Sequence, residues 1–221
     1  MTTPTILFDL DGTLIDSAPD VCRALNRTLE AIGRRTHTVA EATGYLGHGA
    51  PVLMKLALEQ TGDILPDEEI ARLTQNFLDD YAQNPVVDSV VFPGVIPALS
   101  GLRDQGFKLA ICTNKPSITA APVLEMLDLV HHFDAVVCAD QVMKRKPDGT
   151  HVLDTIAAVG GAAERAIMVG DSENDIEAAI DAGVLSILVT FGYAQASHSS
   201  LGADMLMDHF DDLGGLVSEL L

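Results

Sequence analysis

The sequence predicts an α/β fold in which helices cover both faces of a doubly wound parallel sheet, with an all-helical domain inserted near the start of the chain. Two observations lead to this prediction. Short apolar runs bounded by turn signals alternate with helical patterns along most of the 221 residues. About a hundred residues separate the first apolar run from the second, whereas a β–α–β crossover needs only roughly thirty.

Five apolar runs are typical of buried parallel strands, because each is short and is followed by turn signals and a helical pattern. These runs lie at residues 5–8, 108–112, 135–138, 166–169 and 185–189. The helical patterns between them predict helices at about 94–105, 117–127, 148–160 and 173–182. Alternation of this kind predicts a Rossmann-like core.

The long interval after the first strand is helical in pattern and contains no convincing strand. Its expected helices cover residues 18–32, 51–60 and 67–81, the last of which begins behind Pro66. Two turns, at 83–85 and 92–94, mark the return of the chain to the sheet. We therefore expect a core domain formed by residues 1–16 and 85–221, and a helical domain formed by residues 17–84.

Composition and charge narrow the classes of partner. The chain is 48% apolar and 20% charged, which is the balance of a soluble globular protein. Its formal net charge of −19 argues against nucleic acid or an anionic membrane as the main partner. No apolar run approaches the length of a membrane span, and the start lacks the pattern of a signal peptide, so a cytoplasmic monomer or homodimer is expected. The three cysteines, which are far apart, are expected to be reduced and buried.

Polar side chains follow four of the predicted strands, at the edge where open parallel sheets bind ligands. They are Asp9 and Asp11, then Thr113, Asn114 and Lys115, then Lys146 in a basic triplet, and finally Asp171 and Asp175. Taken singly, each could be an ordinary turn residue or helix cap. Taken together, these acids, the hydroxyl and the lysines at one edge indicate a functional site.

The chemistry that suits these groups is phosphoryl transfer from a small phosphorylated metabolite. Carboxylate ligands without nearby histidine or cysteine favour a hard cation, and Mg²⁺ is the ion expected. A carboxylate can act as the nucleophile and form an aspartyl phosphate, while the metal, a lysine and backbone amides offset the charge of the transferred group. A second carboxylate can donate a proton to the leaving oxygen and accept one from the attacking water.

Four motifs resemble those of the haloacid dehalogenase superfamily, in the same order and spread over the whole chain. They are Asp9-Leu10-Asp11-Gly12-Thr13-Leu14, Thr113-Asn114-Lys115, Lys146-Pro147 and Gly170-Asp171-Ser172-Glu173-Asn174-Asp175. The helical insertion resembles the cap domain of that superfamily in its first insertion position. The dehalogenases themselves lack the second acid, so Asp11 implies a phosphatase. Residues 11–17 and 44–50 are most similar to the phosphoglycolate phosphatases, which implies 2-phosphoglycolate as the substrate.

The resemblance also implies roles for individual acids. Asp9 would be the nucleophile and Asp11 the general acid and base. Asp9, the backbone carbonyl of Asp11 and Asp171 would hold the magnesium ion, and Asp175 would be a further ligand or would position the others.

The remaining motif residues would bind phosphate. Thr113 and the backbone amide of Asn114 would bind the phosphoryl oxygens, and Lys146 would offset the charge between nucleophile and phosphate. Relatives often have a second proline two residues after Pro147, where this chain has Gly149. This departure affects only the start of the next helix.

Substrate choice is expected to lie in the cap. A carboxylate-bearing substrate needs a cation or a donor opposite its carboxylate. His48 is the first candidate, since Gly49 and the glycine on its other side let the backbone approach a ligand. Arg23 is a further candidate. His48 could equally be an exposed loop residue at a helix junction.

Other functions remain open at this stage. Within the same superfamily, the alternatives are a pyrophosphatase, a sugar-phosphate or nucleotide phosphatase, and a phosphomutase. Outside enzymes, the alternative is a scaffold that binds a phosphorylated ligand. A silent scaffold would be expected to lack one of the key acids or the lysine, and none of these is missing.

Overall fold

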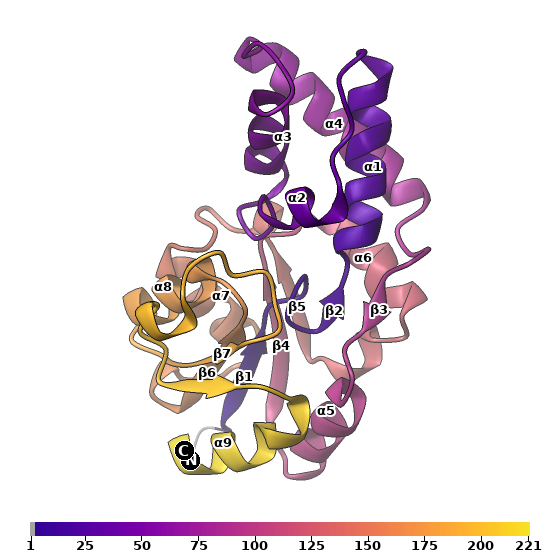
Figure 1. The fold of residues 1–221 in the computed structure, drawn as a ribbon. Helices are drawn as coiled ribbons and strands as arrows, with labels where there is room; N and C mark the ends of the chain where they lie inside the picture. Colours follow the sequence, from indigo (N-terminus) through magenta and orange to yellow (C-terminus); the bar gives the residue numbers. More distant parts are fainter. Residues whose placement is uncertain (1–2) are drawn as a thin grey trace.

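The computed structural model describes residues 3–221 and contains a six-stranded sheet in which every neighbouring pair is parallel (Figure 1). The strands are β1 (Thr5–Phe8), β4 (Lys108–Thr113), β5 (Ala135–Cys138), β6 (Ala166–Gly170), β7 (Leu185–Val189) and β8 (Met205–Met207), in the order β5-β4-β1-β6-β7-β8. All five predicted strands are confirmed. The sixth, β8, was not predicted because it is only three residues long.

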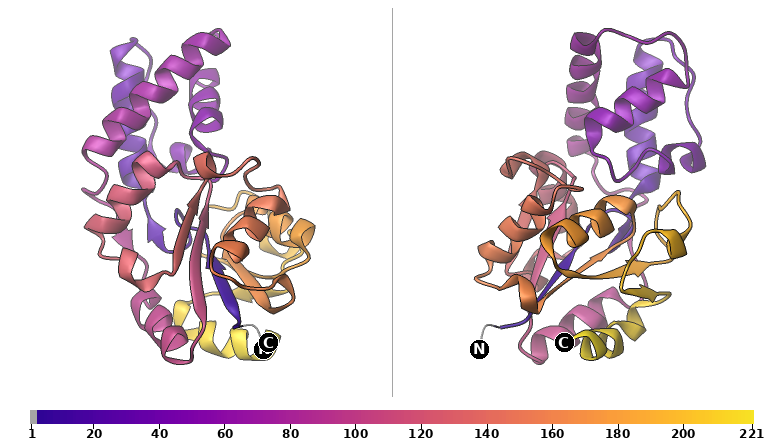
Figure 2. Two further views of the ribbon diagram at one scale, coloured as in Figure 1. Left: turned by 180° about the vertical axis from the view of Figure 1, so that it is seen from behind. Right: turned by 90° about the vertical axis from the view of Figure 1, so that its left-hand side faces the viewer.

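Five helices pack on the two faces of this sheet (Figure 2). They are α5 (Val95–Asp104), α6 (Ser117–Met126), α7 (Gly149–Ala158), α8 (Glu173–Ala182) and α9 (Leu213–Leu220). Successive residues of a strand point to opposite faces, and the core is divided accordingly. Leu7 packs with residues of α7 and α8, whereas Ile6 and Phe8 pack with residues of α5, α6 and α9. The predicted doubly wound α/β fold is therefore confirmed.

The interval between β1 and β4 carries four more helices, which lie beyond the carboxyl edge of the sheet (Figure 1). They are α1 (Ala18–Ala31), α2 (Val39–Thr43), α3 (Ala50–Glu59) and α4 (Asp67–Gln83). The three expected helices are confirmed to within a few residues. Helix α2 was not predicted, because five residues are too few to show a period; it begins at a capping box between Thr38 and Glu41.

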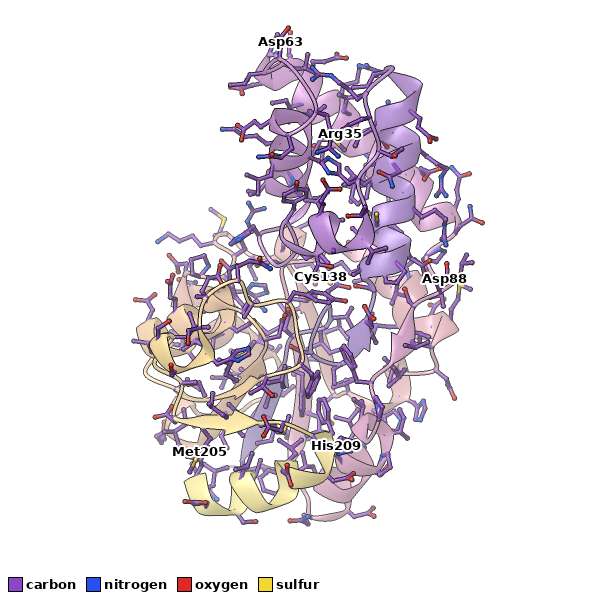
Figure 3. All side chains as sticks on the ribbon, viewed as in Figure 1. Arg35, Asp63, Asp88, Cys138, Met205 and His209 are labelled. Carbon is purple, nitrogen blue, oxygen red and sulfur yellow. The ribbon has the colours of Figure 1, made fainter. Side chains whose placement is uncertain are left out.

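Two short strands join this helical insertion to the sheet. Strand β2 (Ile15–Asp16) pairs with β3 (Val90–Val91) in an antiparallel ribbon, so the outgoing and returning chains lie side by side. Side chains of the insertion and of the sheet edge extend toward one another across the junction (Figure 3). The larger apolar cluster continues from the sheet into the insertion without a break and includes Phe8, Leu14, Met54 and Tyr81.

A buried carboxylate stabilises the junction between the helical insertion and the rest of the chain. Asp20 of α1 accepts hydrogen bonds from the Val87 amide (2.8 Å), the Ser89 amide (2.9 Å) and the Ser89 hydroxyl (2.6 Å). Burial alone would raise the pKa of Asp20, but these hydrogen bonds, led by that of the Ser89 hydroxyl, hold it below its ordinary value. The start of the insertion is thereby tied to the segment by which the chain returns.

Two further expectations can be compared with the structure. The three cysteines are buried and form no disulfide, as predicted. Within residues 3–221, no helix combines the length and the apolar character that crossing a membrane requires.

Candidate active site

Three acids lie together at the carboxyl edge of the sheet. Asp9 directly follows β1, and its amide donates to the Val169 carbonyl of β6 (2.9 Å). Asp171 directly follows β6, and Asp175 lies in the first turn of α8. One carboxylate oxygen from each of Asp9, Asp171 and Asp175 lies within 4.8 Å of the other two, and all three side chains are buried. The register explains this, because Phe8 lies opposite Val169 and the two strands end at the same level.

A buried lysine sits among these acids. The Lys146 Nζ lies 2.6 Å from Asp175 Oδ1 and 3.1 Å from Asp9 Oδ1, and it donates to the Cys112 carbonyl (2.6 Å). Burial alone would lower the pKa of Lys146, but the carboxylates of Asp175 and Asp9 raise it above its ordinary value. One ammonium therefore faces three carboxyl groups, which leaves an excess of negative charge.

That excess of negative charge shifts the pKa values of the acids. Burial raises the pKa of Asp9 to about 6; Lys146 opposes this shift, while Asp175 adds to it. Burial, followed by the neighbouring acids Asp175 and Asp9, raises the pKa of Asp171 well above its usual range. Since three ionised carboxylates cannot be stable here with one ammonium alone, the cluster favours a further cation.

Hydrogen bonding shows which oxygens remain available to such a cation. Asp175 Oδ2 accepts bonds from the Asp171 amide, the Ser172 amide and the Ser172 hydroxyl, and its Oδ1 accepts from Lys146. Asp9 Oδ1 is buried and, within residues 3–221, its polar partner is the Lys146 ammonium, with no further hydrogen bond. An all-oxygen cluster of three buried carboxyl groups that a single ammonium pairs fits a divalent metal ion of the hard class.

The carboxylate of Asp11 lies apart from this cluster. Its Oδ1 accepts from the Ser17 hydroxyl (2.6 Å), and the Lys115 Nζ lies 2.9 and 3.0 Å from its two oxygens. Lys115 also donates to the Tyr81 hydroxyl of α4 (3.1 Å). Burial alone would lower the pKa of Lys115, but Asp11 and Tyr81 raise it above its ordinary value. The sequence places Lys115 at the end of β4 but assigns it no role. Its partner Tyr81 comes from the helical insertion.

The two polar residues before Lys115 also reach this edge. Thr113 is buried, and its hydroxyl accepts from the Lys115 amide (3.2 Å). The side-chain amide of Asn114 donates to the Gly47 carbonyl of the insertion (3.0 Å) and to the Lys146 carbonyl (2.9 Å). Asn114 therefore connects the insertion to the loop that carries Lys146.

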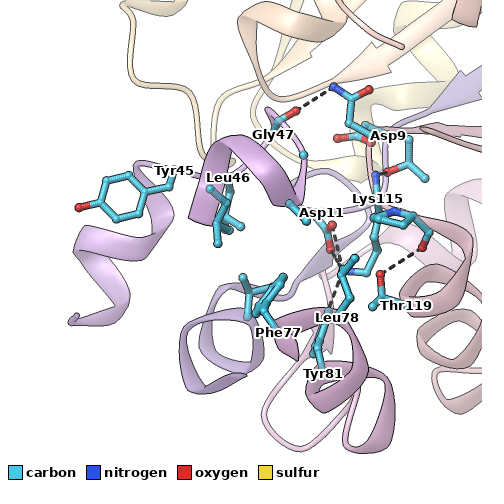
Figure 4. A pocket seen from close by; sticks show the side chains of 17 residues that line it. Asp9, Asp11, Tyr45, Leu46, Gly47, Phe77, Leu78, Tyr81, Lys115 and Thr119 are labelled. Atoms are coloured by element: carbon cyan, nitrogen blue, oxygen red, sulfur yellow. Dashed lines mark hydrogen bonds and ion pairs between the residues drawn. The ribbon is translucent and has the colours of Figure 1, made fainter. Parts of the chain in front are cut away.

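A cavity lies between the carboxyl edge and the insertion (Figure 4). On the core side it is lined by polar residues, namely Asp9, Asp11, Thr113, Asn114 and Lys115. On the insertion side the walls are largely apolar and include Val21, Leu46, Leu53, Phe77 and Leu78. The polar residues predicted after β1 and β4 thus share one cavity, and the buried acids lie beside it.

The cap residues that the sequence suggests for substrate specificity do not all lie in this cavity. The His48 Nδ1 lies 3.0 Å from the Asn174 side-chain nitrogen and its Nε2 lies 3.7 Å from Glu173 Oε1, so the ring packs on the first turn of α8. Gly49, with φ +85°, does line the cavity.

Arg23 also lies away from the cavity. Its guanidinium contacts the carboxylates of Asp20 and Asp88 and donates to the Asn84 carbonyl (3.0 Å), so it belongs to the junction described above. Neither the His48 nor the Arg23 side chain lines the cavity, because local carboxylates and α8 hold them elsewhere.

The fold and the site define an α/β protein with a carboxylate-rich site suited to phosphoryl transfer, and comparison with known proteins agrees. The model of the haloacid dehalogenase-like hydrolase family matches residues 3–183. The chain belongs to this family of hydrolases. Within the family, it is a phosphatase.

Individual relatives cover nearly the whole chain. The phosphoglycolate phosphatase of Agrobacterium fabrum is 42% identical over 219 residues, which span 99% of this chain and 94% of the relative. That of Caulobacter vibrioides is 41% identical over 209 residues, which span 95% and 88%. The crystal structure of a predicted phosphoglycolate phosphatase from Haemophilus somnus is similar at a TM-score of 0.91 and 28% identity, with 98% of each chain covered.

Proposed function

We propose that this phosphatase is a magnesium-dependent phosphomonoester hydrolase that acts through an aspartyl phosphate, with 2-phosphoglycolate as its substrate. The observation that carries the proposal is the buried group of Asp9, Asp171 and Asp175, in which three carboxyl groups share the single ammonium of Lys146. The names of the relatives support the choice of substrate.

In the proposed reaction, an oxygen of Asp9 attacks phosphorus and the bond to the leaving oxygen breaks. Thr113 and the amide of Asn114 bind the phosphoryl oxygens, and Lys146 offsets their charge. Asp11 gives a proton to the leaving oxygen, then accepts one from the water that hydrolyses the aspartyl phosphate. The separation of Asp11 from the buried acids supports this division of roles.

Asp9, the backbone carbonyl of Asp11 and Asp171 would hold the magnesium ion. Asp175 would position these groups, since its own oxygens already accept four hydrogen bonds. When bound, the ion would supply positive charge that offsets the carboxylates and the transferred phosphoryl group.

We further propose that residues 17–84 act as a cap over a catalytic core of residues 1–16 and 85–221. Closing such a cap excludes water and completes the site. The expected hinges lie near Asp16-Ser17 and Asn84-Pro85. Tyr193 supports the first of these positions, because its hydroxyl donates to Asp16 Oδ1 (2.8 Å) and accepts from the Ser17 amide (2.9 Å).

The net charge of −19 supports a small metabolite, not nucleic acid or a membrane, as the partner, and cytoplasmic action as a monomer or homodimer stays part of the proposal. Release of inorganic phosphate from a panel of phosphate esters tests it. The highest kcat/KM is expected for 2-phosphoglycolate, and chelation by EDTA should abolish turnover until magnesium is returned. Inorganic pyrophosphate, nucleotides and glucose 1-phosphate in the panel cover the alternative reactions, and isomerised glucose phosphate would indicate a mutase.

The nucleophile has its own test. Asp9→Asn should lower kcat on every ester by at least about a thousandfold, because the amide cannot form the phosphorylated intermediate. Full metal-dependent turnover of an aryl phosphate by this variant would refute the assignment of Asp9.

A further inference from the structure

Lys115 is unusual among the residues that line the cavity. Within the described part of the chain, it is the only lysine or arginine on the cavity wall. Its side chain is 4% exposed, and among residues 3–221 its Nζ donates hydrogen bonds only to Asp11 and Tyr81. The protein as a whole is strongly acidic, so a buried cation that opens onto the cavity marks the place where an anion can be held.

Tyr81 adds a donor at the same point. Its ring is 1% exposed, its hydroxyl accepts the bond from Lys115, and within residues 3–221 that hydroxyl donates to no acceptor. A phenol has one O–H to donate, and a buried donor without an acceptor is costly. Figure 4 shows Asp11, Lys115 and Tyr81 meeting at one end of the cavity. The unused O–H and the ammonium together suit an anionic acceptor.

The rest of the surroundings limit the size of that acceptor. The cavity walls on the insertion side are apolar, with Leu46, Leu53 and Phe77 among them, and offer no other charge to an anion. The cavity volume is about 50 Å³, against roughly 10–15 Å³ for a single water on the same measure. This is room for a few non-hydrogen atoms, which suits a short leaving group better than a sugar or a nucleoside.

We infer that Lys115 and Tyr81 form the subsite that binds a carboxylate carried by the leaving group of a short phosphate ester. The inference rests on the proposed function and deepens it, because it assigns substrate choice to residues other than His48 and Arg23. One of the two contacts between Lys115 and Asp11 is exchanged for the carboxylate, and the Tyr81 hydroxyl donates to it. Lys115 comes from the core and Tyr81 from α4, so the subsite is complete only when insertion and core are in contact.

The test compares two esters of matched length in the Tyr81→Phe variant, which removes only the hydroxyl. One ester is 2-phosphoglycolate, and the other is 2-hydroxyethyl phosphate, which replaces the carboxylate with a neutral group. The variant should lose about tenfold in kcat/KM on 2-phosphoglycolate, mainly through KM, since it loses one hydrogen bond to a charged group. On 2-hydroxyethyl phosphate, the change should be less than about twofold.

Tyr45→Phe is the matched control. It removes a hydroxyl from another residue of the insertion that lines the cavity, but the Tyr45 ring packs against His37, and Figure 4 shows it directed away from Lys115. The ratio of kcat/KM for the two esters should stay at the wild-type value in this variant. Circular dichroism and thermal unfolding of both variants exclude misfolding as the cause of any loss.

A second pair of variants addresses the cation. Lys115→Met should slow both esters, because Asp11 loses its partner, but it should slow 2-phosphoglycolate more; Lys115→Arg should restore part of the preference. Equal losses on the two esters in both Tyr81→Phe and Lys115→Met would overturn the inference, as would a wild-type enzyme without preference for the carboxylate. If the wild-type enzyme released phosphate from no ester, the proposed function itself would fail.

Discussion

The two sides of the cavity are built on different principles. On the core side, charged groups are buried and held by short contacts, as with Lys146 between Asp175 and Asp9. On the insertion side, apolar side chains such as Leu53 and Phe77 form most of the wall, and Tyr81 supplies a single buried hydroxyl. Under the proposed function, the core would provide the chemistry, and the insertion, together with Lys115 of the core, would determine which leaving group fits.

Among the substitutions that test the core side of the cavity, removal of the Lys146 ammonium should have the largest effect on stability. Lys146→Met leaves the buried acids without their ammonium, which should lower the free energy of unfolding by about 3–5 kcal/mol in the absence of metal. Urea denaturation would measure this. Lys144→Met is the control, because its ammonium lies at the surface beside Asp148, and it should leave the denaturation midpoint nearly unchanged. A similar small effect for both variants would contradict the view that the core depends on Lys146.

The pH dependence of stability offers a second test of the core. Burial, followed by the charge of Lys146, lowers the pKa of His151 from 6.5 to about 4. Since the unfolded chain takes up this proton first, stability should fall as the pH drops from about 6.5 to about 4, by about 3 kcal/mol in total from this group. Urea denaturation over this range would show the slope. His151→Gln should flatten it, and an unchanged slope would show that His151 is already charged in the folded protein.

A substitution at the junction between the insertion and the core should have a smaller effect on the free energy of unfolding. Asp20→Asn keeps the shape of the side chain but removes the charge that accepts hydrogen bonds from Val87 and Ser89 and pairs with Arg23. We expect a loss of about 2 kcal/mol in the free energy of unfolding, because hydrogen bonds to a charged group are lost. Asp88→Asn, at the exposed end of the same group, is the comparison and should cost much less. Equal costs would mean that burial of Asp20 contributes nothing.

The smallest effect is expected at His48. Because its ring packs against Asn174 and Glu173, His48→Ala should change kcat/KM on 2-phosphoglycolate by less than about threefold. Steady-state kinetics would measure this. A loss of kcat/KM as large as that expected for Tyr81→Phe would indicate that His48 contributes to substrate specificity, as the sequence alone suggested.

Sequence reasoning succeeded where the position of a residue follows from the strand that precedes it. Asp9 and Asp171 could be brought together without a structure, because the carboxyl ends of parallel strands meet at one edge. It was less successful where position depends on how a helix packs. The contact between Lys115 and Tyr81 depends on the orientation of α4 over the sheet, which a helical pattern does not specify. His48 was singled out by its glycines, but glycines do not determine which way the ring between them points.

The central place of β1 in the sheet has a consequence for how the protein is made. Thr5 pairs with Lys108 on one side and with Ala166 on the other, so the strand that leads to Asp9 is synthesised first but must wait for both neighbours. Pairings between residues so far apart in sequence are characteristic of slowly folding chains. A nascent chain that has not yet reached β6 has neither the second partner of β1 nor Asp171, so the reactive edge is assembled only after most of the polypeptide has been translated.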